Sequence, residues 1–575
     1  MKDSRSASQI LFGLLPHQTL DAKGNIWKVA SWKTLPVHNV DPDELRRALE
    51  RAAAPWAMAT PATDHGFVQA LRQNRQVRVE TLDRAGGVRV LPFPSWFRCK
   101  NRSCNRLHKK QRARCECGSK GPHGQLPFVL FHDACGEIRE PHFRSCSTCN
   151  QVSMRLPGTT NLSEIRLYCP QCSRDLGNGF LHVKCQCGLP GNRSDDRPEN
   201  MEFAVHRSAA VFTPRSIVIV NPPSKQQMRD LKQAGGGQAA LTWIADGMEA
   251  TWVDKVDGAK AAALRRDLLD RGLDIATVDT MMASSKLLES GVAAIEAPEK
   301  VLEEAHSEAM SIALAMSKTR LTISNLIESS IGETKAKYET SYRKALSDAG
   351  IQRIDLIERF PILTGQFGYT RGDHEPGKAR LRTFNEKDGA YIVYGDVSET
   401  EALIVRLDPR RVLEWMNLRG HSFTPTKDQK KAYVSLLSRL DDDGVLNDVT
   451  TLVHSMSHRM VRHASFYAGI DRNALAELLF PHTLSFATYA IPRGDFVLGG
   501  LQAVYAYDLD QLLHKVVFDE SRCALDPGCS SNPEGAACAV CLHLGEPSCR
   551  MFNTKLDRKV LFDRRHGYWR FKSSY

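Results

Sequence analysis

The spacing of apolar residues predicts a helical region in the middle of the chain. Between residues 224 and 360, apolar side chains recur every three or four positions with Lys, Glu and Arg between them. The pattern is clearest in Ala259–Arg271, Pro298–Met316 and Leu321–Ala349. A period of about 3.6 residues is typical of amphipathic helices. The sequence therefore predicts a largely helical domain at 201–360.

Short runs of β-branched and aromatic residues predict strands on both sides of this region. The expected strands are Val88–Leu91, Ile217–Val220, Ala379–Phe384, Tyr391–Val393, Ala402–Leu407, Ser485–Ala490 and Val497–Tyr505. Further helices are expected at Arg410–Leu418 and Val449–Tyr467. Residues 367–371, with the sequence Phe-Gly-Tyr-Thr-Arg, are interpreted as a turn that presents Arg371. Together these patterns predict an α+β fold.

The patterns divide the chain into four parts. We expect a mixed lead-in at 1–95, a tandem zinc-ribbon-like module at 96–200, the helical domain at 201–360, and an α/β domain at 361–575 that ends in a cysteine zinc site. No apolar run approaches the roughly 18 residues of a membrane span. The first residues do not resemble a signal peptide. We therefore expect a cytoplasmic protein that does not contact membranes.

The sixteen cysteines lie in two clusters. Eleven fall between Cys99 and Cys187, five fall between Cys523 and Cys549, and the 335 residues between the clusters contain none. Disulfides are rare in cytosolic proteins, so closely spaced cysteines there are typical of metal sites. The clustering predicts zinc ligands.

The first cluster consists of close pairs at regular spacing, and tetrahedral zinc needs two such pairs. We expect three zinc ribbons in tandem. Their predicted ligands are Cys99, Cys104, Cys115 and Cys117; then His132, Cys135, Cys146 and Cys149; then Cys169, Cys172, Cys185 and Cys187. A cross-braced arrangement, in which alternate pairs share a metal, uses the same residues. His142 or His182 could replace His132.

The second cluster has one cysteine more than a tetrahedral zinc site requires. We favour Cys529, Cys538, Cys541 and Cys549 as ligands, with Cys523 as a spare or substitute. The expected total is three to four zinc ions. Sites rich in thiolates leave no position open for water, so these zinc ions are expected to be structural.

The net charge of +11 is concentrated in two segments. Nine Lys and Arg stand against one acidic residue between Arg98 and Lys120, and eight stand against two from Arg550 to Tyr575. Aromatic residues lie beside both segments, namely Trp96, Phe97, Tyr568, Trp569 and Phe571. Basic and aromatic residues together are typical of nucleic-acid contacts.

The candidate nucleic-acid contacts are Arg98, Lys100, Arg102, Lys109, Lys110, Arg112, Arg114, Arg371, Arg564 and Arg565. A solvated face, or a contact with an acidic protein surface, is the alternative interpretation of the same residues.

Motifs of nucleotide hydrolysis and acyl transfer are absent from the sequence. There is no G-x4-G-K-[ST] loop, no Asp-Glu-x-His/Asp box and no G-x-S-x-G elbow. His454 and His458 have the spacing of a metal-binding pair on a helix but lack the acid of a metalloprotease helix, which favours a structural role. We expect no enzymatic activity. The alternatives are an enzyme with an unrecognised site near His454, His458 and Asp495, and a pure protein scaffold.

Several stretches carry a family resemblance. They are Trp96–Cys99 with the cysteine pairs after it, Phe367–Arg371 with Thr400–Leu403, His454–His458, and, most specifically, Ala537–Leu542, Glu546–Cys549 and Asn553–Arg558. Together they resemble the DrmB family, helicase-associated zinc-binding subunits of the DISARM anti-phage defence system. The C-terminal end resembles a domain of unknown function common beside superfamily 2 helicases. Leu14-Leu15-Pro16 departs from the family's proline-glycine turn, and the cysteines before residue 190 are unusually numerous.

The resemblance implies a non-catalytic, DNA-binding accessory subunit. It would pair with a DrmA-like superfamily 2 helicase in a bacterial defence complex that includes a DNA methyltransferase. The DNA would be phage DNA, single-stranded or duplex with an overhang. ATP hydrolysis would belong to the helicase.

Overall fold

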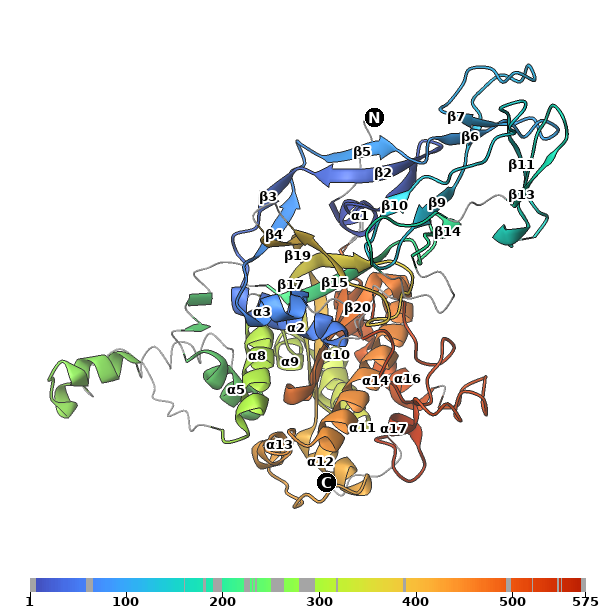
Figure 1. Ribbon diagram of the computed structural model, residues 1–575. Coiled ribbons are helices and arrows are strands. Elements are labelled where there is room, and N and C mark those ends of the chain that lie inside the picture. The colour runs from blue at the N-terminus through green and yellow to red at the C-terminus, as the bar shows by residue number, and fades with distance from the viewer. Residues whose placement is uncertain are drawn as a thin grey trace. The chain divides into compact units, whose positions relative to one another are not determined.

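A computed structural model gives the fold of the chain (Figure 1). It describes residues 7–57, 66–159, 161–178, 183–189, 199–221, 228–229, 231–232, 235–249, 263–278, 295–316, 319–385, 389–492, 498–519, 521–545, 548–549 and 551–569. Helices and strands both occur among these residues, mostly in separate runs along the chain, which confirms the α+β class. No helix among them is both long and apolar enough to cross a membrane.

The chain forms two compact units that do not follow the four predicted domains. Unit 1 consists of Met1–Ile217 and Thr364–Asp396, and unit 2 of Val218–Leu363 and Val397–Tyr575. The lead-in and the cysteine-rich module thus belong to unit 1. The helical region and the C-terminal region together form the core of unit 2. Three strands, β15 (Thr213–Val220), β17 (Ile351–Thr370) and β19 (Tyr391–Leu407), supply residues to both units.

The first part of unit 1 is built from strands packed on a small apolar core. β1 (Thr19–Ala22), β2 (Asn25–Trp32) and β5 (Val88–Pro92) form an antiparallel sheet, and α1 (Ala7–Gly13) contributes Leu11 to the core beneath it. β3 (Thr34–Pro36) pairs with β4 (Val77–Leu82), and β4 runs parallel to residues 391–394 of β19. β18 (Arg382–Asn385) pairs with both long strands.

Three short helices follow β3 in unit 1. α2 (Pro42–Ala53) begins at Asp41, whose carboxylate accepts from the Asp43 backbone N–H, with proline at the first helical position. The turn η1 (Ala54–Trp56) and α3 (Gly66–Arg72) complete this layer.

The cysteine-rich part of unit 1 consists of three small three-stranded sheets. The first contains β6 (Trp96–Arg98), β7 (Leu107–Lys109) and β8 (Gly124–Gln125). The second contains β9 (Phe128–Phe131), β10 (Ile138–Arg139) and β14 (Glu202–Val205). The third contains β11 (Ser153–Arg155), β12 (Arg166–Tyr168) and β13 (Asp175–Asn178), with the turn η2 (Leu162–Glu164) between β11 and β12. β15 (Thr213–Val220) leads out of this region.

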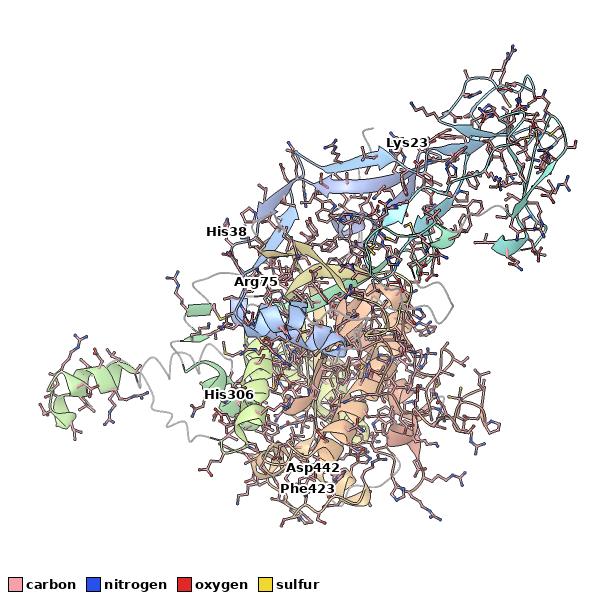
Figure 2. The ribbon with its side chains drawn as sticks, viewed as in Figure 1. Lys23, His38, Arg75, His306, Phe423 and Asp442 are labelled. Carbon is pink, nitrogen blue, oxygen red and sulfur yellow. The ribbon has the colours of Figure 1, made fainter. Side chains whose placement is uncertain are left out.

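The first half of unit 2 is helical, as expected. α5 (Gly236–Ala245) packs on α8 (Glu299–Ala315). The two helices approach each other closely at Gly237. A Cβ at this position would lie only 2.6 Å from the Cβ of His306, which is on α8 and is labelled in Figure 2. The predicted helix at 321–349 is divided into α9 (Ile323–Glu328), α10 (Gly332–Lys337), the π-helical turn η3 (Tyr338–Tyr342) and α11 (Arg343–Ala349). Residues 263–270, within the predicted helix 259–271, are also helical.

The second half of unit 2 surrounds one long buried helix, α14 (Asp443–Ala468). Asp442, labelled in Figure 2, caps its N-terminus by accepting from the Gly444 backbone N–H. Around α14 lie β20 (Leu475–Phe480), β21 (Ser485–Ala490) and α16 (Leu509–Phe518). The remaining elements are β16 (Arg320–Leu321), α12 (Pro409–Leu418), α13 (Gln429–Leu437), η4 (Arg472–Ala474), η5 (Pro481–Thr483), α15 (Gly500–Ala503), η6 (Val504–Asp508) and α17 (Lys559–Phe562).

Some predicted elements are wrong. The last residues of the predicted helical region, 351–360, and the expected turn at 367–371 both belong to β17, a strand of 20 residues. The expected strand at 497–505 is helical over the described residues 500–505. Leu501, Val504 and Tyr505 are all buried, and this spacing of three and four fits a helix. The Glu401 carboxylate accepts from the Leu501 and Gln502 backbone N–H groups, so tertiary contact completes the helix start.

Candidate metal centres

The predicted metal ligands gather into compact groups in both units. Neighbouring Sγ atoms within a group lie 3.4 to 3.8 Å apart. A disulfide would hold them at about 2.0 Å. Tetrahedral zinc with Zn–S bonds of about 2.3 Å places sulfurs roughly 3.8 Å apart. The spacing of the thiols therefore fits the edges of metal tetrahedra.

Cluster 1 consists of Cys99, Cys104, Cys115 and Cys117, as predicted. Cys99 follows β6 directly and Cys104 lies in the turn before β7, so one hairpin supplies half of the site. The Cys115 N–H donates to Ser119 O, which closes the second turn. A backbone hydrogen bond at Ser119 lowers the pKa of Cys117 to about 7, which favours the thiolate that binds zinc.

Cluster 3 consists of Cys146, Cys149, Cys169 and Cys172. The first pair precedes β11 and the second follows β12, and these strands are antiparallel with Ser153 opposite Tyr168. Antiparallel pairing brings the start of one strand beside the end of the other, so the two pairs meet. The Cys149 and Thr148 backbone N–H groups lower the pKa of Cys146 to about 6.

Cluster 2 consists of His132, Cys135, Cys185 and Cys187. His132 follows β9, and its Nδ1 lies 3.3 Å from Cys135 Sγ and 3.5 Å from Cys187 Sγ. β14 pairs with β9, and the Cys185 N–H donates to Glu199 O just before β14, so the second pair is carried to the first.

The structure thus corrects the predicted pairing of the two inner ribbons. Four ligand pairs follow one another along the chain, at 132/135, 146/149, 169/172 and 185/187. The first and fourth pairs share one site and the second and third share another, so the pairs are nested. This is neither the tandem nor the cross-braced arrangement. The strand partners β9–β14 and β11–β12 impose this order. His132 is the histidine of the site. His142 is exposed, and His182 lies outside the described residues.

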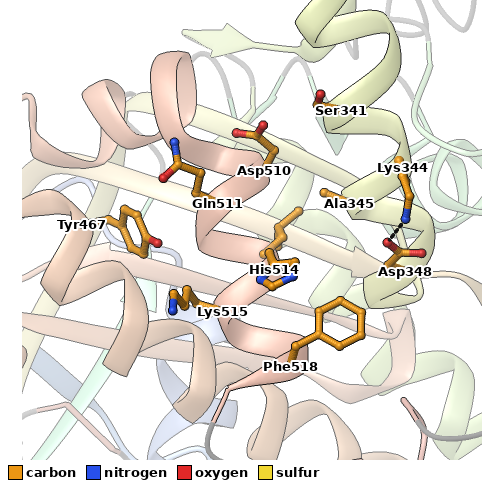
Figure 3. Close-up of a pocket in the computed structure, with 11 residues that line it drawn as sticks. Ser341, Lys344, Ala345, Asp348, Tyr467, Asp510, Gln511, His514, Lys515 and Phe518 are labelled. Atoms are coloured by element: carbon orange, nitrogen blue, oxygen red, sulfur yellow. Dashed lines mark hydrogen bonds and ion pairs between the residues drawn. The ribbon is translucent and has the colours of Figure 1, made fainter.

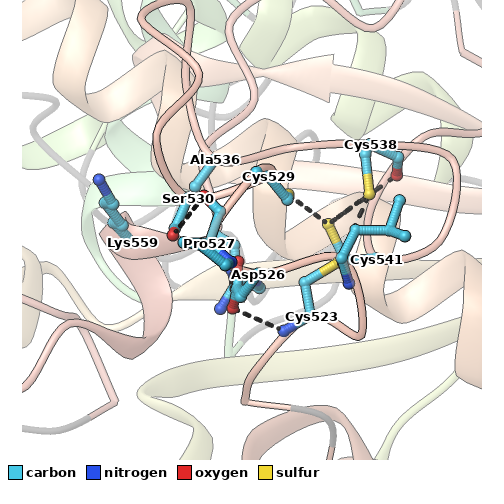
Figure 4. Close-up of polar contacts among 12 residues, drawn as sticks. Cys523, Asp526, Pro527, Cys529, Ser530, Ala536, Cys538, Cys541 and Lys559 are labelled. Carbon is cyan, nitrogen blue, oxygen red and sulfur yellow. Dashed lines mark hydrogen bonds and ion pairs between the residues drawn. The ribbon is translucent and has the colours of Figure 1, made fainter.

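Cluster 4 consists of Cys523, Cys529, Cys538 and Cys541 (Figure 4). Cys523 is therefore a member of the group and Cys549 is not, which corrects the predicted ligand set. The Asp526 carboxylate holds the loop by accepting from the Cys523 backbone N–H at 3.0 Å and from Arg558 Nη2 at 2.8 Å. Cys549 lies instead in a buried group with His454, His458 and Glu477.

The basic residues around cluster 1 lie mostly on the surface. Lys100, Arg102, Lys109, Lys110, Arg112 and Arg114 are exposed, and Arg98 is half-buried. Glu116, the acid of this segment, pairs with Arg106 and Arg112. Within the described part of the chain, Lys100, Arg102, Lys109, Lys110 and Arg114 form no ion pair. Arg564 and Arg565 near the C-terminus are also exposed.

Arg371 is not a surface contact, contrary to expectation. Its side chain is fully buried and donates to the carbonyl oxygens of Gly136, Val211 and His17. The guanidinium also lies over the Tyr369 ring, 4.9 Å from its centroid. Arg371 therefore ties three segments of unit 1 together and is closed to DNA.

The aromatic residues beside the basic segments are also mostly closed to bases. Phe97, Tyr568 and Trp569 are buried. Tyr568 and Trp569 donate to the carbonyl oxygens of residues 350 and 349. Trp96 is half-buried against Phe143, and Phe571 lies outside the described residues. Stacking by Phe97, Tyr568 or Trp569 is therefore excluded in this fold.

The two histidines of the suggested enzymatic site are closed to solvent. His454 and His458 are fully buried on α14, and Asp495 lies outside the described residues. Sequence reasoning missed Glu477, which lies between the two imidazoles. It is a single acid in β20, a strand that the sequence pattern did not predict, and no spacing signal links it to the histidines.

A pocket of about 410 Å³ lies between α11 and α16 (Figure 3). Several of the charged groups in and around it are already paired: Lys344 with Asp348 at 2.6 Å and Lys515 with Asp519 at 2.8 Å. Lys337 pairs with Asp510 at 3.4 Å. These ion pairs leave little uncompensated charge for a ligand.

Comparison with known families adds one match. Residues 6–213 match the model of a domain of unknown function, DUF8724. No curated protein matches the chain. The matched segment contains the ligands of clusters 1, 2 and 3.

Proposed function

We propose that this chain is a non-catalytic, DNA-binding accessory subunit of a superfamily 2 helicase in a DISARM-like anti-phage defence complex. The observation that carries the DNA-binding part is the exposed basic surface around cluster 1. The helicase part rests on the sequence resemblance at the C-terminal end, which includes Cys538 and Cys541 of cluster 4 and the segments that follow them. Zinc is the metal that the cysteine groups fit best.

The basic surface has the physical properties of a phosphate-binding site. Its exposed cations lie on β7 and on the short loops that connect the ligands of cluster 1. A preformed arrangement loses little conformational entropy on binding. Each lysine or arginine that neutralises a phosphate releases counterions, so the affinity depends strongly on salt.

Two observations support a role without catalysis. The thiolate-rich groups supply four protein ligands each, which leaves no metal position for a reacting water. The histidine pair on α14 is buried away from solvent, so a substrate cannot reach it without unfolding the core.

Neutralising the basic surface is expected to weaken DNA binding. In Lys100→Gln/Arg102→Gln/Lys109→Gln/Arg114→Gln, affinity for a 30-nucleotide duplex with a single-stranded overhang should fall about tenfold or more near 0.15 M salt. The slope of log affinity against log salt should become shallower by up to about 3.6, or roughly 0.9 for each lost phosphate contact. Fluorescence anisotropy across a salt series measures both.

The matched control removes four exposed cations from unit 2. Lys300→Gln/Lys335→Gln/Arg343→Gln/Lys431→Gln changes the net charge by the same amount, and all four residues are exposed. It should leave the affinity within about twofold. Equal weakening by both variants would mean that only overall charge matters, and no effect of either would refute the DNA-binding proposal.

The helicase proposal is tested by co-purification. When the chain is expressed with a DrmA-like superfamily 2 helicase, the two should elute as one complex at about 0.15 M salt. The unit 1 variant described above should still bind the helicase. If it loses the helicase but keeps its DNA affinity, the basic surface contacts protein and the scaffold alternative is correct.

A further inference from the structure

A fifth group of metal-ligand side chains lies in the core of unit 2. His454 and His458 extend from successive turns of α14 and meet Glu477 from β20 and Cys549 from the C-terminal segment. Their ligand atoms all lie within 4.8 Å of one another, and all four residues are buried. We propose that His454, His458, Glu477 and Cys549 bind one structural zinc ion, separate from the four cysteine-rich clusters.

The distances fit one shared metal. The Nε2 atoms of His454 and His458 lie 3.0 and 3.1 Å from the same oxygen, Oε1 of Glu477. Cys549 Sγ lies 3.4 Å from His454 Nε2. Zinc bonds of about 2.0 to 2.3 Å in a tetrahedron place N and O roughly 3.3 Å apart and N and S roughly 3.5 Å apart. The observed separations are close to both values.

The proton positions also favour a cation between these groups. His458 Nδ1 lies 2.8 Å from the carbonyl oxygen of Leu542, which can only accept, so Nδ1 carries a proton. In a neutral imidazole, Nε2 is then an acceptor, and it faces the Glu477 carboxylate oxygen, another acceptor. Two acceptors this close repel unless a proton or a metal ion lies between them. A bound zinc ion removes the conflict and needs no buried imidazolium.

The surrounding contacts are those of a supported metal site. The Leu542 carbonyl orients the His458 ring, as outer partners of zinc-bound histidines commonly do. The Ser457 hydroxyl donates to Oε2 of Glu477, which leaves Oε1 for the metal. The Asn553 backbone N–H points to Cys549 Sγ at 3.3 Å.

The charge of the donor set suits a divalent ion. A thiolate and a carboxylate supply two negative charges, which Zn²⁺ neutralises inside the buried core. Mixed imidazole, carboxylate and thiolate donors match zinc better than magnesium or calcium, which prefer oxygen. With four protein ligands and no exposed face, the site is structural.

The proposed site joins cluster 4 to the core of unit 2. Leu542, the partner of His458, directly follows Cys541 of cluster 4. The Glu477 backbone N–H donates to the carbonyl of Ser548, beside Cys549. One ion would therefore fix α14, β20 and the C-terminal segment in a single arrangement.

Metal content tests the proposal on the full-length chain. Purified wild-type protein should contain five zinc ions per chain, as measured by elemental mass spectrometry. The X-ray absorption fine structure at the zinc edge should show an average of about 3.2 sulfur ligands per zinc ion, whereas the four cysteine-rich sites alone would give about 3.75. Four equivalents with the higher sulfur number would overturn the proposal, and this readout needs no substitution.

Variants locate the fifth ion. Glu477→Gln and Cys549→Ser should each lose one equivalent, and Cys529→Ser should lose a different one, so Cys529→Ser/Cys549→Ser loses two. The control Ser455→Ala changes a buried, non-ligand residue on the same helix and should keep five. If Glu477→Gln and Cys549→Ser both fold and retain the wild-type zinc content, the four side chains form a hydrogen-bonded ion pair without metal.

Discussion

The double variant Cys135→Ser/Cys185→Ser is expected to lose one zinc ion and not two. Both cysteines belong to cluster 2 in the nested arrangement. A zinc site that has lost one thiolate no longer holds the ion tightly, so a second loss at the same site removes nothing more. The tandem arrangement, by contrast, places Cys135 and Cys185 in different ribbons and would lose two.

Two further double variants complete the test, because the nested arrangement predicts different numbers of lost zinc ions for them. Cys135→Ser/Cys146→Ser should lose two zinc ions, because these residues belong to clusters 2 and 3. Cys146→Ser/Cys169→Ser should lose one, since both are in cluster 3. Tandem ribbons predict one loss for the first of these variants and two for the second. The cross-braced arrangement predicts two for both.

The expected effect is large because zinc supplies much of the stability of such small modules. Structural zinc contributes roughly 10–16 kcal/mol of apparent binding free energy at neutral pH. The strands of these modules are only two to four residues long, too short to fold on their own. Zinc content and amide hydrogen exchange over residues 128–205 measure the loss, and Ser147→Ala, an exposed neighbour of Cys146, should leave both unchanged.

Replacing Arg371 is expected to destabilise unit 1 without acting through DNA. Arg371→Met keeps much of the side-chain volume but removes the donors to the carbonyls of Gly136, Val211 and His17. Buried carbonyls that lose their partners cost about 1–3 kcal/mol each. With partial relaxation, we expect a loss of about 3–5 kcal/mol in the free energy of unfolding of unit 1.

Thermal unfolding and hydrogen exchange at residues 136 and 211 measure this loss. The control Arg114→Met removes an exposed cation from the same unit, and its stability should change by less than about 0.5 kcal/mol while its DNA affinity falls. A stable Arg371→Met protein with weakened DNA binding would restore the original interpretation of Arg371 as a surface contact.

The metal-ligand pairs were predictable from the sequence because their chemistry is local. Cys99 with Cys104, and Cys146 with Cys149, are close enough along the chain to bind one ion in almost any fold. Which pair meets which depends on strands such as β9 and β14, whose partners are some 70 residues apart. Only long-range pairing decides that order.

Helices were predicted best where one face packs against the core. The predictions for α8 and α12, at Pro298–Met316 and Arg410–Leu418, match the structure closely. The apolar spacing and the start signals of both helices depend only on residues close together along the chain. Residues 351–360 were predicted to be helical and 367–371 to be a turn, because β17 is buried over nearly its whole length and lacks the simple alternation that predicts a strand.

The sequence by itself determined that this is an α+β protein with closely spaced pairs of metal-ligand residues and a strongly basic segment around its first cysteines. The tertiary structure decided the sharing of cysteines between sites, the burial of Arg371, and the meeting of Glu477 and Cys549 with the histidine pair. The physical reason is distance along the chain. Ligand type, charge and periodicity act over a few residues, whereas burial and coordination join segments separated by tens or hundreds of residues.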